Sequence, residues 1–364
     1  MKRLLLLLAF AVCAGAWLRA QAVTPFKLGT FQRGNQIFVG AVVADSVIDL
    51  VTANAALPGT RVAVPADMKE LIARYDTGVR ERIGEIVRTY ASVTGARPAY
   101  SYALSSVRTL PPIMYPAVML NAAVNYREHG LEMERAGASP QQQAATGAPP
   151  PGTAPAGTRT MNGIWPRAAT DTRWNPYVFL KSPSAIIADG EAIRIPRGRT
   201  QVDWECELGV IVSKPTRYVT AAEAPDHIFG YTMEMDVSDR EARGDNRYGS
   251  DWLIAKNHDT FAPMGPFITP REFVPNPRNL PVTFTLNGTV MQDASTALMI
   301  HDVFELVSYG SNIMTLRAGD VIATGSPAGV GSARTPPVFL KAGDRTSCTY
   351  QGVGTLSNTV TSSQ

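Results

Sequence analysis

The sequence predicts a mostly β protein with some α structure, in which a small α+β amino-terminal domain precedes a larger β-rich domain. Residues 111–364 contain short runs rich in Val and Ile, separated by Gly and Pro, and show no internal repeat. Runs of this kind favour a β architecture over alternating strands and long helices. Pro111, Pro112 and Pro116 mark the boundary between the two domains.

The small domain, residues 23–110, combines strand-like runs with one helical pattern. Residues 26–31 and 36–43 read as short strands broken by Gly and Asn. Between residues 68 and 91 apolar side chains recur at helical spacing, which predicts an amphipathic helix. These apolar positions are Leu71, Ile72, Tyr75, Val79, Ile83, Ile86 and Val87.

Residues 1–22 have the features of an export signal. Lys2 and Arg3 precede an apolar run, and Ala20-Gln21-Ala22 offers a cleavage site between small residues. The apolar run is too short to span a bilayer comfortably. We therefore expect a protein that is exported to the periplasm or secreted, without stable membrane insertion.

The charge balance argues against nucleic acid as a partner. The chain has 34 basic and 31 acidic residues, and the leader holds three of the bases and none of the acids. The mature chain is therefore close to neutral, and no run of Lys or Arg interleaves with aromatic residues.

A low-complexity insertion occupies residues 136–171. It is rich in Pro, Gln, Ala and Gly, a composition that cannot bury enough apolar surface to fold alone. Two interpretations stay open, a lid over a neighbouring site or a loop that a partner orders.

The segment 203–212 predicts a strand with an unusual distribution of charge. Asp203, Glu205 and Glu207 alternate onto one face, while Trp204, Cys206 and Leu208 alternate onto the other. Carboxylates this close destabilise the fold unless a cation lies among them, although a solvated strand face is the alternative. Glu205 and Glu207, joined by Asp236, would form an all-oxygen site that suits Mg²⁺ or Mn²⁺, with Ca²⁺ also compatible, rather than Zn²⁺.

Two cysteines lie outside the leader, Cys206 and Cys348. An oxidising compartment would allow them to pair. Because Cys206 alternates onto the apolar face of its strand, we expect buried free thiols, with a disulfide as the alternative.

His129 and Glu132 are three residues apart, so a helical turn places them on one face. A carboxylate that orients an imidazole makes a general base able to deprotonate water near neutral pH. The alternative for such a pair, taken alone, is an ordinary surface contact.

Two further segments carry candidate substrate contacts. Lys256 lies in an apolar, turn-rich setting, where it could bind a carboxylate or an enolate. Residues 319–331 read as a strand that opens into a Gly-rich turn without the Lys of a P-loop. We expect the Thr324 hydroxyl and backbone N–H groups of this turn to approach a substrate carboxylate.

Taken together, these motifs resemble the fumarylacetoacetate hydrolase family. The resemblance covers about residues 116–360, interrupted by the insertion, and residues 25–108 look like the small amino-terminal domain of that family. The motifs that carry it occur in the family's order: Asn125-Tyr126 with His129 and Glu132, Glu205-x-Glu207, Asp236-x-Ser238-x-Arg240, Lys256 with Asp259, and residues 324–331.

The resemblance implies a mixed β-roll catalytic domain, usually dimeric, that holds Mg²⁺ or Mn²⁺ through Glu205, Glu207 and Asp236. It implies substrates that are 2-oxo acids or 1,3-diketones, and a His129–Glu132 dyad that activates water for cleavage of a C–C bond. The groups expected to hold the substrate or stabilise its developing charge are Tyr126, Arg240, Arg243, Lys256, Thr324 and Gly325.

Two positions depart from the family pattern. Arg243 stands where the family often has Gln, and it would either face the site and favour a more acidic substrate or form a surface salt bridge. His258 stands where the family often has Phe. It would either transfer protons or fill the packing role of the aromatic ring, and we favour packing.

Our first hypothesis is an exported, metal-dependent hydrolase that cleaves a C–C bond in a 2,4-diketo acid, such as an acylpyruvate- or fumarylacetoacetate-like substrate. The alternative keeps the same site but makes the protein a decarboxylase, isomerase or dehydratase of a 2-oxo acid. A third hypothesis is a non-catalytic protein that binds an oxo acid. We expect a homodimer.

Overall fold

The computed structural model describes residues 24–59, 62–136, 165, 167–168, 170–171, 173–245 and 251–363. The predicted leader and most of the low-complexity insertion lie outside this part of the chain. Within it, no helix combines the length and the apolar character needed to cross a membrane.

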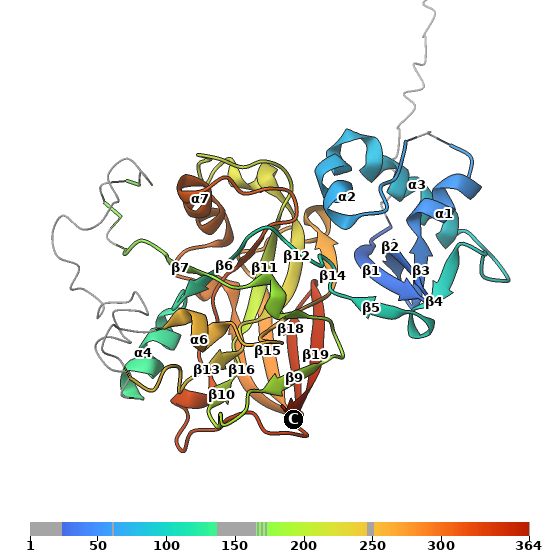
Figure 1. Ribbon diagram of the computed structural model, residues 1–364. Helices are drawn as coiled ribbons and strands as arrows, with labels where there is room; N and C mark the ends of the chain where they lie inside the picture. Colours follow the sequence, from blue (N-terminus) through green and yellow to red (C-terminus); the bar gives the residue numbers. More distant parts are fainter. Residues whose placement is uncertain are drawn as a thin grey trace, which may run out of the picture.

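The architecture is mostly β, as predicted, and Figure 1 shows a small lobe beside a larger one. A twelve-stranded sheet runs through both lobes, and its main path has the order β4-β3-β2-β1-β14-β12-β11-β17-β6-β7. A five-stranded sheet of order β16-β15-β18-β19-β9 and a β10-β13 pair complete the larger lobe.

The small lobe is built from five strands and three helices. Both predicted strands form, and β2 pairs antiparallel with β1 along its whole length. The elements are β1 (Lys27–Arg33), β2 (Gln36–Val43), β3 (Ser46–Asp49), α1 (Leu50–Ala56), α2 (Met68–Arg74), α3 (Arg80–Ala91), β4 (Ser101–Ala103) and β5 (Arg108–Leu110).

The helix predicted over residues 68–91 forms, but it is broken in the middle. A π turn, Tyr75–Val79, separates α2 from α3, and Gly78 adopts a φ of 98° there. Glycine takes this left-handed conformation at little cost, so the chain bends at Gly78 while both halves keep their apolar faces on the core.

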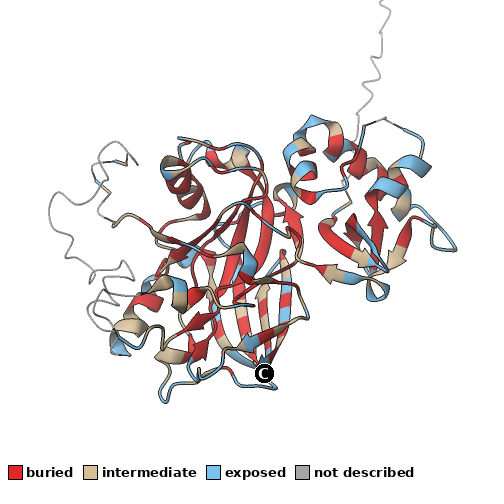
Figure 2. Ribbon diagram, in the orientation of Figure 1, coloured by how far each residue is buried: buried red, intermediate tan, exposed pale blue. Residues whose placement is uncertain are grey.

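The larger lobe carries the remaining strands and helices. Its central strands β11 and β12 are buried along their whole length (Figure 2). The elements are β6 (Met119–Ala123), α4 (Arg127–Arg135), β7 (Tyr177–Leu180), β8 (Ile186–Ile187), β9 (Ala192–Ile195), β10 (Val202–Asp203), β11 (Cys206–Val212), β12 (Ile228–Met235), β13 (Ser238–Asp239), α6 (Trp252–Lys256), β14 (Ala262–Pro270), β15 (Pro281–Leu286), β16 (Thr289–Ser295), α7 (Val303–Ile313), β17 (Val321–Ala323), β18 (Arg345–Tyr350) and β19 (Gly354–Ser362).

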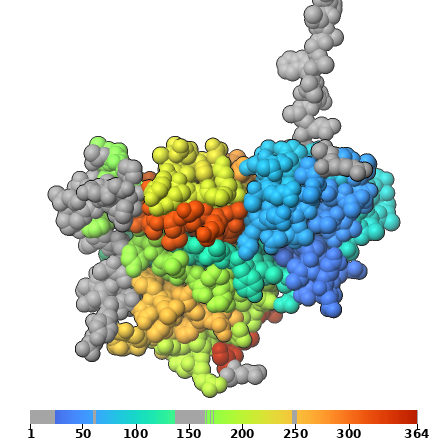
Figure 3. All heavy atoms as spheres, turned by 45° about the horizontal axis from the view of Figure 1, so that its top comes forward, coloured from blue at the N-terminus to red at the C-terminus, as the bar shows by residue number. Residues whose placement is uncertain are grey.

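One hydrophobic cluster contains residues of both lobes. Leu28 of β1 pairs with Ile268 of β14, and both side chains belong to a cluster that also contains α2 and α3 residues. The Lys69 side chain lies against Gly319, and its Nζ donates to the Tyr115 carbonyl at 2.9 Å. In the space-filling view of Figure 3 the blue small lobe lies directly against the larger lobe. The small lobe is therefore fixed to the sheet of the larger lobe.

The structure corrects two details of the segment 203–212. The predicted strand is interrupted, because β10 ends at Asp203 and β11 begins at Cys206. Cys206 and Cys348 form a disulfide, which joins β11 to β18, rather than remaining free thiols. Strand alternation correctly placed Cys206 in the core, but it carried no information about Cys348, which is 142 residues away.

Arg82 provides a test of how the small lobe is held. Its buried guanidinium donates to the carbonyls of Asn54, Leu57 and Pro58 and pairs with Glu85. We expect Arg82→Ala to lower the free energy of unfolding by about 3 kcal/mol, because several buried acceptors lose their donor. Urea unfolding of the purified protein measures this change.

Arg80→Ala, on the same helix, is the control. The Arg80 side chain is 45% exposed and pairs with the exposed acids Asp76 and Glu81, so its loss should cost less than about 1 kcal/mol. Equal effects of the two substitutions would contradict this account of the lobe.

Candidate metal centre and active site

Three carboxylates meet where β11 and β12 lie side by side. Glu205 immediately precedes β11, Glu207 lies on it, and Asp236 immediately follows β12. The antiparallel pairing of Cys206 with Met235 brings these positions together. All three residues are buried, and one oxygen from each lies within 4.8 Å of the others. The structure thus brings together the three carboxylates that the sequence analysis named as candidate metal ligands.

Three cations surround this carboxylate cluster. The Lys256 ammonium donates to Glu205 at 2.8 Å and to Asp236 at 2.6 Å. The Arg240 guanidinium donates to Glu205 at 2.7 Å, and the fully buried Lys181 ammonium donates to Asp236. Such pairing offsets part of the cost of burying carboxylates.

The two glutamates have opposite pKa shifts. Burial acts to raise the pKa of Glu205, but Lys256 and Arg240 outweigh it and bring the pKa below its usual range. Burial raises the pKa of Glu207 well above its usual range, and the neighbouring carboxylates raise it further. Glu207 therefore lacks the charge compensation that Glu205 has.

Glu207 also has an unused acceptor. Its Oε2 accepts the Gly325 N–H at 2.7 Å, whereas its buried Oε1 has no hydrogen-bond partner among the described residues. A divalent cation would satisfy this oxygen and reverse the repulsion among the carboxylates. Three carboxylates form an oxygen-only ligand set, which fits Mg²⁺, Mn²⁺ or Ca²⁺.

The predicted dyad is formed on α4. His129 Nδ1 lies 2.7 Å from Glu132 Oε1, and the His129 side chain is 5% exposed. Glu132 Oε2 in turn accepts the Gly329 N–H at 2.8 Å. The Gly-rich turn that binds Glu132 through the Gly329 N–H also binds Glu207 through the Gly325 N–H, so one segment holds both the dyad and the carboxylate cluster. The contact with Glu132 fixes the orientation of the imidazole.

The Gly-rich turn binds carboxylates of the protein itself. Its backbone N–H groups bind carboxylates of the protein: Gly325 donates to Glu207, Gly329 to Glu132, and Gly331 to Asp203 at 2.7 Å. Gly325, predicted to contact substrate, thus supports a candidate metal ligand. A Cβ at position 331 would lie 1.9 Å from the Val338 carbonyl oxygen, which explains the need for glycine there.

Of the other residues predicted to bind substrate, some are already paired with acids of the protein and others are not. Arg240 binds Glu205 and Asp203, and Arg243 pairs with Asp245 at 2.5 Å, as in the surface salt-bridge alternative. Tyr126 is buried next to α4, and burial raises the pKa of its phenol. The Thr324 hydroxyl is buried without a hydrogen-bond partner among the described residues, so it remains available to a substrate.

The structure adds residues that the sequence interpretation missed. Lys181 directly follows β7 and is buried. A lysine placed directly after an apolar strand was the signal that the sequence offered. Glu234 of β12 lies opposite Glu207 in the sheet and accepts from Asn121 at 3.2 Å. Burial raises the Glu234 pKa to about 8. Nothing in the local pattern around Glu234 distinguishes it from a strand residue facing solvent.

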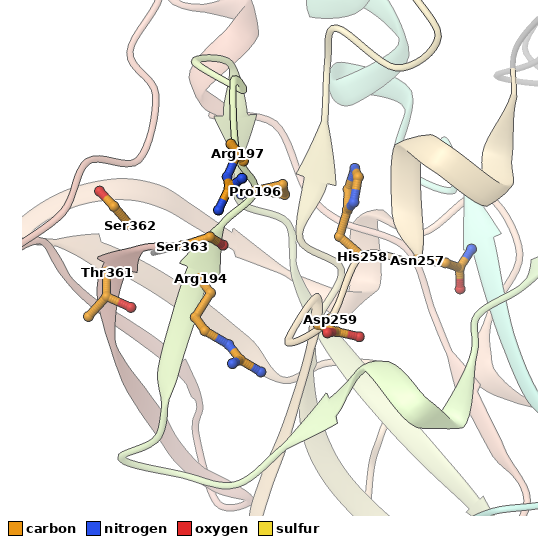
Figure 4. Close-up of a pocket in the computed structure, with 9 residues that line it drawn as sticks. All are labelled: Arg194, Pro196, Arg197, Asn257, His258, Asp259, Thr361, Ser362 and Ser363. Atoms are coloured by element: carbon orange, nitrogen blue, oxygen red, sulfur yellow. The ribbon is translucent and has the colours of Figure 1, made fainter.

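His258 lies outside the carboxylate cluster. Its Nε2 is 3.1 Å from Asp239 Oδ2, and its ring packs edge-on against Phe261 with 5.0 Å between centroids. With Arg194, Arg197 and Asp259 it lines a hollow of about 910 Å³ near the end of the chain (Figure 4). The contact with Phe261 is a packing contact, whereas the contact with Asp239 and the place in the hollow suit proton transfer, so both interpretations of His258 stay open.

Sequence comparison shows which known proteins this chain is similar to. The model of the fumarylacetoacetate hydrolase C-terminal domain matches residues 119–361. Oxaloacetate tautomerase YisK of Bacillus subtilis is 31% identical over 339 residues, which cover 92% of this chain and 99% of that protein. The mitochondrial oxaloacetate tautomerase FAHD2A of Bos taurus is 40% identical over 185 residues, which span 51% of this chain and 59% of the bovine protein.

Solved structures show the same fold. The maleylpyruvate hydrolase of Sphingobium sp. SYK-6, in complex with manganese(II) and pyruvate, superposes with a TM-score of 0.65 at 26% identity, covering 93% of this chain and all of that one. The 2-hydroxyhepta-2,4-diene-1,7-dioate isomerase of Mycobacterium marinum gives a TM-score of 0.61 at 26% identity, covering 93% of this chain and 98% of that one.

The raised pKa of Glu234 predicts a pH dependence of stability without metal. Its folded-state pKa of about 8 lies above the ordinary value of 4.5, so the folded protein holds this proton more tightly than the unfolded chain. In a chelating buffer, stability should fall as the pH rises from about 4.5 to about 8. Glu234→Gln should flatten this slope, measured by thermal unfolding, whereas Glu81→Gln at an exposed position should not. An unchanged slope in Glu234→Gln would contradict the assignment.

Proposed function

The chain belongs to the fumarylacetoacetate hydrolase family, and we propose that it is a divalent-metal-dependent enzyme that interconverts the enol and keto forms of a 2-oxo acid of the oxaloacetate type. The observation that carries this proposal is the oriented His129–Glu132 dyad beside three buried carboxylates. The similarity to the Bacillus tautomerase along nearly the whole chain supports this reaction over others built on the same site.

Glu205, Glu207 and Asp236 would hold the ion, which would supply a Lewis acid for the oxygen of the 2-oxo group. The unsatisfied Oε1 of Glu207 and its raised pKa both favour a cation at this position. Mg²⁺ and Mn²⁺ are the ions that we propose, because this donor set provides oxygen alone.

His129 would move the proton. Its Nδ1 is hydrogen-bonded to Glu132, which leaves Nε2 as the ring nitrogen that would exchange a proton with the substrate. Nε2 can accept a proton from the enol hydroxyl or from the carbon next to the 2-oxo group and return it to the other position, which interconverts the tautomers without a net change in protonation. Glu132 stabilises the protonated imidazole, and the Gly329 N–H keeps the Glu132 carboxylate in place.

The substrate carboxylate needs donors that the protein has not already used. The buried Thr324 hydroxyl meets this requirement. Lys256 lies at the edge of the cluster with its ammonium on Glu205 and Asp236, and it adds positive charge where the substrate gains negative charge.

Hydrolysis of a C–C bond in a 2,4-diketo acid is the second candidate. The same dyad can deprotonate a water, and a solved relative with this fold is a maleylpyruvate hydrolase. Decarboxylation also proceeds through an enolate, so analysis of the products must distinguish the three reactions.

We also propose that the protein is exported, as expected from the leader, and that it forms a homodimer, as expected from the resemblance.

The decisive experiment follows enol-oxaloacetate absorbance with Mn²⁺ or with a chelator, while pyruvate is assayed in parallel. Faster loss of enol without pyruvate would establish tautomerisation. Pyruvate with CO₂ would indicate decarboxylation, and pyruvate with a carboxylic acid from acylpyruvates would indicate hydrolysis. Saturable oxo-acid binding without any product would contradict the proposal and favour a binding protein.

His129→Gln tests the role of the dyad. Loss of the proton-transfer group should lower kcat by about 10²- to 10⁴-fold, while Mn²⁺ affinity measured by calorimetry should stay within about two-fold, because His129 is not among the clustered ligands. Arg194→Ala at the exposed hollow is the matched control and should keep full activity. Full activity of His129→Gln would remove the dyad from the mechanism.

A further inference from the structure

The disulfide between Cys206 and Cys348 lies next to two of the candidate metal ligands in the sequence. Cys206 is the residue between Glu205 and Glu207, and Cys348 lies on β18 of the five-stranded sheet. Both cysteines are fully buried. The bond therefore links the segment that carries two candidate ligands directly to the second sheet.

The backbone of Cys206 is held from the same side by two further contacts. Its N–H donates to Gln292 Oε1 at 3.2 Å, and its carbonyl accepts the Tyr350 hydroxyl at 3.3 Å. Gln292 lies on β16 and Tyr350 at the end of β18, so both belong to the five-stranded sheet. Gln292 also donates to the Pro327 carbonyl of the Gly-rich turn at 2.7 Å.

Glu205 needs this support because the strand is interrupted beside it. Residues 204 and 205 lie between β10 and β11, outside the regular ladder. The Glu205 carbonyl accepts one bond, from the Asp236 N–H at 2.9 Å. The start of β11 therefore sets where the Glu205 side chain begins, and the disulfide adds a covalent link to the hydrogen bonds that hold the start of β11.

We propose that the Cys206–Cys348 disulfide is a positioning element of the metal centre, so that oxidation of the two thiols raises the affinity for the divalent ion. This inference rests on the metal site proposed above. Closure of the bond removes two electrons and two protons from the thiols, and a low-molecular-weight disulfide of the glutathione class accepts them and becomes two thiols. The compartments to which the predicted leader would direct the chain are oxidising, so disulfides form and persist there.

Thermodynamic linkage provides a test on the unmodified protein. If the disulfide raises metal affinity by some factor, saturating Mn²⁺ must raise the equilibrium constant for disulfide formation by the same factor. Disturbing groups that orient metal ligands commonly costs 10- to 100-fold in affinity, so we expect a shift of about 10-fold or more. The protein is equilibrated in glutathione redox buffers with and without Mn²⁺, approached from both the oxidised and the reduced side, and its thiols are counted by alkylation and mass spectrometry.

The outcomes separate the two proposals. A shift of about 10-fold or more in the thiol–disulfide equilibrium supports the positioning role. Mn²⁺ binding to the oxidised protein with no shift overturns this inference and leaves the metal centre standing. Absence of saturable Mn²⁺ binding to the oxidised protein overturns the metal centre itself. Two free thiols in protein purified from an oxidising compartment would also overturn the inference.

Cys206→Ala combined with Cys348→Ala provides a second test. Where this variant folds, its Kd for Mn²⁺, measured by calorimetry well below its Tm, should rise by about 10-fold. Val282→Ala is the control, because Val282 lies in the same hydrophobic cluster, on β15, and holds no ligand segment. This control should lower Tm without changing the Kd. A lowered Tm with an unchanged Kd in the double variant would overturn the positioning role and show that the disulfide only stabilises the fold. If the variant does not fold, the linkage measurement on the unmodified protein decides.

Discussion

The structure depends on the balance of charge around one buried group of carboxylates. Glu205, Glu207, Glu234 and Asp236 all lie in the interior, where uncompensated negative charge is costly. Lys181, Lys256 and Arg240 supply positive charge to two of these acids, Glu205 and Asp236. Glu207 and Glu234 have no cation within ion-pair distance among the described residues, and both have a raised pKa. A divalent ion bound among these carboxylates would complete this balance, and it would then contribute to the stability of the fold as well as to the chemistry.

The backbone provides the second means of holding negative charge. The turn after β17 donates N–H groups to Glu207, Glu132 and Asp203 in sequence. One segment therefore sets the position of a candidate ligand, of the dyad's carboxylate and of the acid that binds Arg240. A Cβ at position 331 would lie 2.7 Å from Asp203 Oδ1, so a glycine there lets the turn approach this carboxylate closely. Three N–H groups of the turn bind the protein's own carboxylates.

Much of the site could be predicted from sequence because its signals are local. The spacing of His129 and Glu132 requires only one helical turn, and α4 provides it. The pair Glu205 and Glu207 required only strand-like spacing. The mostly β fold and the small-lobe strands followed from short alternating runs.

What could not be predicted depends on contacts between distant segments. Lys181 meets Asp236 across 55 residues, and Cys206 meets Cys348 across 142. The use of Arg240 for Asp203 and Glu205 also depends on the β10–β13 pairing, which brings Asp203 opposite Ser238. No periodicity encodes such pairings, and the break between β10 and β11 disturbs the periodicity itself.

Location of the ion is the most direct test of the central claim. Crystals grown with Mn²⁺ would be measured at the manganese absorption edge, and the anomalous difference map would be calculated. The account predicts one strong peak within about 2.0–2.6 Å of carboxylate oxygens from Glu205, Glu207 and Asp236. A map without a peak among these three residues, from protein that is folded and oxidised, would contradict it.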